Sequence, residues 1–152
     1  MQGVVSKNWV YPLLTLLGGL GLVIYGSALY ANPRILIEWQ TATEIDTVGF
    51  NLYRAEDIDG PYQKINEALI PASNEPFKGA SYRYEDANVV PNRVYYYQLE
   101  DVDNQGKATQ HEPISVQAKP QGLIEILGGV GIMIIGFVFA ARNRSRQHIS
   151  LL

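Results

Sequence analysis

Two long apolar runs dominate the sequence, one over residues 10–31 and the other over residues 121–141. Each is close to the roughly 20 residues that an α-helix needs to cross the hydrocarbon core of a bilayer. The pattern therefore predicts a membrane protein with two transmembrane helices. Residues 32–120 are too polar for lipid and form a domain between the helices, with residues 1–9 as a short N-terminal segment and 142–152 as a basic tail.

Within the middle segment, apolar and polar residues alternate with the period of two that is typical of half-buried strands. Gly-containing turns separate the alternating stretches, and no stretch keeps a helical period. The expected strands are 35–40, 50–54, 62–65, 82–86, 94–99 and 108–118. The side chains expected to form the core of the domain are those of Ile37, Trp39, Phe50, Leu52, Tyr95, Tyr97 and Leu99. Short strands and turns at this spacing predict a small antiparallel β-sandwich.

Several of these stretches resemble a fibronectin type III domain. Residues 35–39 (ILIEW) resemble its second strand with the core tryptophan, and residues 49–54 (GFNLYR) resemble its third strand. Residues 89–95, with Val, Pro and Tyr at the first, third and seventh positions, resemble the tyrosine corner of that family, in which the phenol ties the sheet corner to nearby backbone. Residues 102–106 resemble its final hairpin, and residues 39–50 are similar to a bacterial cell-surface subgroup.

The chain departs from that family at the start of the domain, because almost no sequence lies between Ala31 and Ile35 for a first strand. The resemblance covers about residues 35–118. It implies a sandwich that lacks this strand and exposes a sheet edge unless a partner or a loop covers it. It also implies binding or spacing, with no catalytic site.

The two apolar runs share a pattern of glycines. Gly18, Gly19, Gly21 and Gly26 recur at the same spacing as Gly128, Gly129, Gly131 and Gly136, and Ala140 follows as a further small residue. Gly19 and Gly26, seven residues apart, fall on one helical face, and so do Gly129 and Gly136. Small residues let helices in lipid approach closely, so these stripes are expected to pack the two helices on one another or on helices of a partner. The alternative is that glycine is simply common in membrane helices.

Charge predicts the orientation of the chain. Lys7 precedes the first run, and Arg142, Arg144 and Arg146 follow the second, which places both termini in the cytoplasm. Residues 34–119 carry 8 Lys and Arg against 14 Asp and Glu, a net charge of −6. An acidic domain argues against nucleic-acid binding. We expect a bacterial inner-membrane protein with a periplasmic or extracellular domain.

The residues that usually hold cofactors are sparse. The chain has no cysteine, and neither apolar run contains a histidine that could ligate haem. Glu125, inside the second run, is either an interfacial carboxylate near a helix N-terminus or part of a polar or proton path. A partial calcium-loop pattern at Asp101, Asp103, Gly106 and Glu112 is interrupted at Gln105 and reads as a hairpin turn. No catalytic, cofactor or metal site is expected.

Three functions fit these features. The first is a non-catalytic accessory subunit of a multi-subunit bacterial membrane complex, with integral membrane subunits and the lipid bilayer as its partners. Small cofactor-free proteins with two spans are frequent in respiratory and photosynthetic electron-transfer complexes, which makes these the favoured hosts. The second is a membrane-anchored adhesion or ligand-binding module. The third treats the C-terminal run and its arginines as a sorting tail, which would make the second span temporary.

Overall fold

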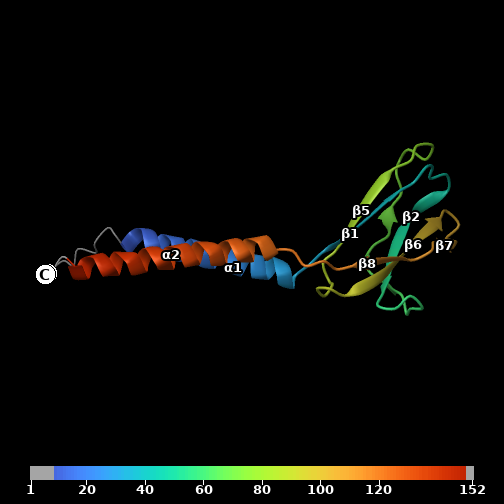
Figure 1. Cartoon of the computed structure of the whole chain (residues 1–152). Helices are drawn as coiled ribbons and strands as arrows, with labels where there is room; N and C mark the ends of the chain where they lie inside the picture. The colour runs from blue at the N-terminus through green and yellow to red at the C-terminus, as the bar shows by residue number, and fades with distance from the viewer. Residues whose placement is uncertain (1–8, 150–152) are drawn as a thin grey trace. The chain divides into compact units, whose positions relative to one another are not determined.

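A computed structural model of the chain describes the backbone of residues 9–149 and the side chains of residues 9–142. The chain forms two compact units: the helices α1 (Val10–Ala31) and α2 (Leu123–Ile149), and an antiparallel β domain over residues 32–119 (Figure 1). The strands are β1 (Ile35–Gln40), β2 (Thr47–Ala55), β3 (Gln63–Lys64), β4 (Ile70–Pro71), β5 (Ser81–Asp86), β6 (Val94–Asp103), β7 (Ala108–Gln110) and β8 (Ile114–Gln117).

Both helices are long and apolar enough to cross a membrane, over Val10–Ala31 and Leu123–Arg142. Their large apolar side chains point outward: Tyr11 is 73% exposed and Ile124 84% exposed. The buried positions of α1 are Pro12, Gly19 and Gly26. This arrangement is the reverse of a soluble helix, which buries large apolar residues and exposes polar ones.

α2 continues beyond the predicted span, through most of the segment expected to be a tail, and ends at Ile149. Residues 142–149 contain no glycine or proline, and their Arg and Gln residues favour helix, so nothing stops the helix at residue 141. Among the residues predicted to set the orientation, Arg142 is exposed. Lys7 lies outside the described residues, as do the side chains of Arg144 and Arg146.

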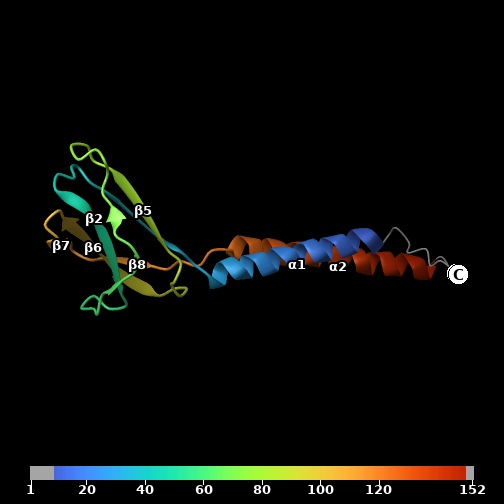
Figure 2. The same cartoon turned by 180° about the vertical axis from the view of Figure 1, so that it is seen from behind.

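The β domain consists of two antiparallel sheets (Figure 2). One contains only β1 and β5, in a register that pairs Ile37 with Tyr84. In the other, β3, β2 and β6 are neighbours, β4 also pairs with β2, and β7 and β8 pair with different parts of β6. The expected strand 108–118 is thus two strands, because it is interrupted at residues 111–113, where Pro113 has no backbone N–H to donate.

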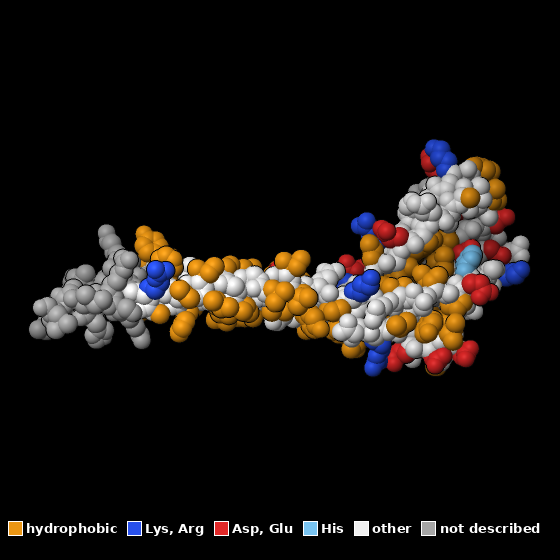
Figure 3. All heavy atoms as spheres, viewed as in Figure 1, with side chains coloured by type: hydrophobic (Ala, Val, Ile, Leu, Met, Phe, Trp, Pro, Cys, Tyr) orange, Lys and Arg blue, Asp and Glu red, His pale blue; other side chains and the backbone are white. Residues whose placement is uncertain are grey.

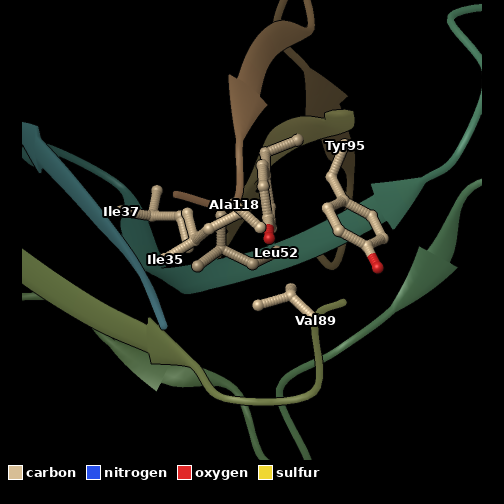
Figure 4. Packing of buried hydrophobic residues seen from close by; sticks show 7 residues of the cluster. Ile35, Ile37, Leu52, Val89, Tyr95 and Ala118 are labelled. Atoms are coloured by element: carbon tan, nitrogen blue, oxygen red, sulfur yellow. The ribbon is translucent and has the colours of Figure 1, made fainter. Parts of the chain in front are cut away.

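Side chains from both sheets meet in one hydrophobic core (Figure 4). β1 contributes Ile35 and Ile37, and the larger sheet contributes Leu52, Tyr95 and Tyr97, all at most 6% exposed. Phe50 is also buried, at 1% exposed. The two other residues expected in the core, Trp39 and Leu99, are only half-buried and pack against it. The core is therefore fully buried around Ile35 and Ile37 of β1, whereas Trp39 and Leu99 at its margin are partly exposed.

Tyr95 binds the backbone of the segment that precedes its strand. Its side chain is 2% exposed, and its hydroxyl oxygen accepts a hydrogen bond from the Val90 N–H at 2.9 Å. The phenol thus ties β6 to the chain that leads into it.

We expect Tyr95→Phe to lower the free energy of unfolding by about 1–2 kcal/mol, because the Val90 N–H would lose its acceptor. The measurement is urea unfolding of the full chain in mild detergent, followed by near-UV circular dichroism. Tyr96→Phe is the control, since Tyr96 follows Tyr95 on the opposite face of β6 and is only partly buried. Equal stability of the two variants would contradict the role of Tyr95.

Candidate functional site

The helices approach each other through glycines, which we call the glycine seam: Gly19 and Gly26 of α1, Gly129 and Gly136 of α2, and Gly122 just before α2. A Cβ atom on Gly19 would lie 2.6 Å from the Gly129 carbonyl oxygen, and one on Gly129 would lie 2.5 Å from the Gly19 oxygen. A Cβ on Gly26 would lie 2.6 Å from the Gly122 oxygen. At these distances no residue other than glycine fits without moving a backbone.

The seam has a seven-residue period. Gly19 faces Gly129, and Gly26, seven residues later in α1, faces Gly122, seven residues earlier in the chain than Gly129. The two helices are therefore antiparallel. Gly136 continues the series and faces Thr15 and Leu16. A spacing of seven keeps one stripe of each helix facing its neighbour over two turns. The sequence analysis missed Gly122, although it stands seven residues before Gly129.

The other four glycines do not lie in the seam. At Gly18, Gly21, Gly128 and Gly131, no atom beyond the neighbouring backbone of the same helix lies within 4 Å of the position a Cβ would take. Successive residues are turned by about 100° around a helix, so a residue next to a seam glycine points well away from the seam. The nine small residues expected to pack are therefore divided: four face the other helix, four glycines face outward, and Ala140 is half-buried.

Glu125 lies in the first turn of α2, and a Cβ on Gly26 would meet the Glu125 Cβ at 2.9 Å. The residue is therefore at the edge of the glycine seam, close to the N-terminus of the helix. A carboxylate there is stabilised by the unpaired N–H groups of the first turn.

In the β domain, Glu44 fixes the loop between β1 and β2. It is 2% exposed and accepts hydrogen bonds from the hydroxyls of Thr41 and Tyr82, both at 2.6 Å, and from the Ser73 N–H at 2.5 Å. Burial alone would raise the pKa of Glu44, but these three hydrogen bonds outweigh it and hold the pKa below its usual value. Burial and the Glu44 carboxylate raise the pKa of Tyr82 to about 12.

A second buried carboxylate joins the two sheets. Asp86 of β5 accepts hydrogen bonds from Arg54 of β2 at 2.7 Å and from the Tyr97 hydroxyl of β6 at 2.9 Å. Its other oxygen accepts from the Asn88 N–H at 2.9 Å. Burial and this carboxylate raise the pKa of Tyr97 well above its usual value. Arg54 also lies over the Tyr95 ring, 5.1 Å from its centre.

In both clusters the carboxylate has a donor on each oxygen, so its hydrogen bonds link segments within the domain. The sequence analysis did not identify Glu44 or Asp86. Along β5, every second residue faces inward, and Asp86 is the last of these inward residues. This alternation was the signal in the sequence that Asp86 would be buried.

The partial calcium pattern is a turn. Asp103 Oδ1 accepts from the N–H groups of Gln105 and Lys107, while Asp101 lies 3.1 Å from His111. Over the described residues, no three His, Cys, Asp or Glu side chains come together as metal ligands. A shallow hollow lined by Glu38, Trp39, Gln40, Ser81 and Tyr82 has no histidine, cysteine or lysine in its lining.

The seam predicts a specific cross-link in this cysteine-free chain. A Cβ on Gly136 would lie 3.2 Å from the Thr15 Cβ, a few tenths of an ångström short of the roughly 3.5–4.5 Å found in disulfides. We expect Thr15→Cys with Gly136→Cys to form an intramolecular disulfide on mild oxidation, seen as a mobility shift on a non-reducing gel. Thr15→Cys with Gly131→Cys is the control and should stay reduced, because Gly131 faces away from α1. Equal cross-linking of both pairs would contradict this packing.

The lowered pKa of Glu44 predicts acid sensitivity. Glu44 contributes stability above the usual carboxyl pKa of 4.5, and this contribution is lost as the pH falls towards the lower pKa of the folded state. Glu44→Gln should cost about 1.5–3 kcal/mol at pH 7 and should flatten the loss of stability below pH 5. The measurement is urea unfolding between pH 3 and 7. Glu75→Gln, which removes an exposed carboxylate, should change neither property.

No protein-family model matches the chain, and no curated protein matches it significantly.

Proposed function

We propose that this chain is a non-catalytic accessory subunit of a multi-subunit bacterial membrane complex. In this proposal α1 and α2 span the inner membrane, and the β domain lies on its outer side. The observation that carries the proposal is the second set of glycines, Gly18, Gly21, Gly128 and Gly131, which the chain's own helix pair does not use.

Two of these outward glycines share one face of the helix pair. Gly18 precedes Gly19 and Gly128 precedes Gly129, and Gly19 and Gly129 face each other across the seam. In antiparallel helices the same 100° step back along each chain turns both residues to the same side. Gly18 and Gly128 therefore lie side by side in projection, on a broad face formed by both helices.

Glycine on a lipid-facing surface has no benefit of its own. In a helix interior it costs about 1 kcal/mol relative to alanine. Lipid provides no hydrophobic gain for helix pairing, so a smooth glycine face stabilises the fold only where another helix can approach it closely. Helices of a larger complex are the partners that this face fits.

The β domain supports a structural role. We regard it as a fibronectin type III-like sandwich without the first strand, which agrees with its two-stranded sheet and with the Tyr95 hydrogen bond. Its buried carboxylates hold loops and sheets together. The net charge of −6 over residues 34–119 and the arginines after residue 141 favour an outer domain and cytoplasmic termini. A respiratory or photosynthetic electron-transfer complex remains the host we favour.

The test compares two double variants on the outward face. Gly18→Leu with Gly128→Leu should release the protein from its complex, because the added side chains keep other helices away. Gly18→Ala with Gly128→Ala is the matched control and should keep most of the association. The measurement is the size and composition of the particle that tagged protein forms after extraction in mild detergent.

Wild-type protein that extracts alone, or as a small homo-oligomer, would overturn the proposal and favour the surface-binding alternative. The Thr15–Gly136 cysteine pair, introduced into each variant, should still cross-link, which shows that the helix pair itself is intact.

A further inference from the structure

The two-stranded sheet has an unpaired edge along β1. The Thr41 N–H donates to the Ala80 carbonyl at 2.9 Å, directly after the β1–β5 register that pairs Gln40 with Ser81. Hydrogen-bonded and non-hydrogen-bonded pairs alternate along antiparallel strands. The N–H and C=O groups of residues 35, 37 and 39 therefore face β5, and those of residues 36, 38 and 40 face the free edge.

Ile35 of β1 and Ala118, just after β8, belong to the same packed core, and beyond them the inner face of the larger sheet is uncovered at Ile114. Ile114 pairs with Tyr97 and Val116 pairs with Tyr95, so both residues of β8 share the face that the buried tyrosines turn to the core. Ile114 is nevertheless 54% exposed. Figure 3 shows hydrophobic side chains gathered in a hollow of the domain. We call the strip between β1 and β8 the open seam.

The opposite side of the small sheet is covered. The Tyr84 hydroxyl of β5 donates to the Ile65 carbonyl at 2.6 Å, and Glu44 binds both Tyr82 of β5 and the Ser73 backbone. The segment between β3 and β5 thus closes the domain beyond β5, and no described segment does so beyond β1.

The link between α1 and β1 is too short to supply the missing strand, because only three residues, 32–34, connect them. A second copy of the chain fits poorly. Antiparallel pairing of two β1 strands about Glu38 would place two Glu38 carboxylates opposite each other, and pairing about Ile37 would place Glu38 opposite Leu36.

We propose that the open seam accepts one extended strand of a partner protein, which pairs with β1 through residues 36, 38 and 40. Alternate residues of that strand are apolar and cover Ile37 and Ile114, and a lysine or arginine lies opposite the exposed Glu38. The acidic domain, with its net charge of −6, favours such a basic segment. Trp39 Nε1, a buried donor without an acceptor among the described residues, lies on the same strand.

This inference rests on the proposed function, because it assumes that the partner belongs to the same complex. An added strand slows hydrogen exchange at every second backbone amide of β1, because it pairs with alternate N–H groups. A partner that docks only through side chains leaves no such alternation. The experiment is hydrogen–deuterium exchange at single-residue resolution, on the full chain in its native detergent-extracted complex and on the full chain expressed alone.

In the complex, the amides of Leu36, Glu38 and Gln40 should exchange at least about tenfold more slowly than in the isolated chain. The amides of Ile37 and Trp39, already bonded to β5, should be slow in both samples. A large complex in which the three edge amides exchange as fast as in the isolated chain would overturn the inference and leave the proposed function standing. A homo-oligomer with protected edge amides would overturn the partner assignment, and a lone particle would overturn both proposals.

Proline substitutions provide a matched pair of variants. Glu38 and Arg83 face each other in one non-hydrogen-bonded pair and form an exposed ion pair at 3.4 Å, so either variant loses the same contact. Glu38→Pro removes an N–H from the β1 edge, whereas Arg83→Pro removes one from the outer edge of β5. Glu38→Pro should abolish protection of Leu36 and Gln40 in the complex, and Arg83→Pro should keep it. If Glu38→Pro fails to fold, the exchange pattern of the unmodified protein decides.

Discussion

Only Asn32, Pro33 and Arg34 separate the end of α1 from the start of β1, and this short link limits what the β domain can become. Ile35 enters the core at once, next to Ala118 near the other end of the domain. These three residues are too few to form a strand outside β1. The small sheet therefore stops at two strands, Trp39 and Ile114 keep exposed surface, and the edge of β1 has no partner among the described residues.

The two units reach stability by opposite means. The helix pair puts its smallest residues inside, so that backbone meets backbone, and leaves large apolar side chains outside. The β domain buries tyrosines and aliphatic side chains, and it accommodates the carboxylates of Glu44, Asp86 and Glu100 by surrounding each with donors. Glu44 and Asp86 link segments of the domain that are distant in sequence through hydrogen bonds. Gly19 and Gly129 link the two helices by allowing their backbones to come into contact.

Period and composition were sufficient to predict both helices, the antiparallel sheets and the inward side of β1, because Ile35, Ile37 and Trp39 carry an unambiguous alternation. The seven-residue spacing placed Gly19 with Gly26 on one face, and Gly129 with Gly136 on another, and these four glycines do meet the opposite helix. It could not show whether that face meets the chain's own second helix or a partner, because the face that a helix turns to its neighbour depends on a register that only the other helix defines. Burial of Glu44 depends on Tyr82 and Ser73, whose approach follows from the sheet pairing. The break at Pro113 was readable from the sequence, since proline cannot donate to a ladder.

The seven-residue period of the glycine seam also fixes the register of the two helices along their axes. A slide of α1 along α2 by one turn would drive side chains into backbone, and the next register that matches glycine with glycine lies seven residues away, about 10.5 Å. The two ends of the helix pair that lead to the β domain, Ala31 and Gly122, are therefore held at a fixed offset. Because the glycine contacts oppose sliding, a displacement of one of these ends along the helix axis moves the other end with it.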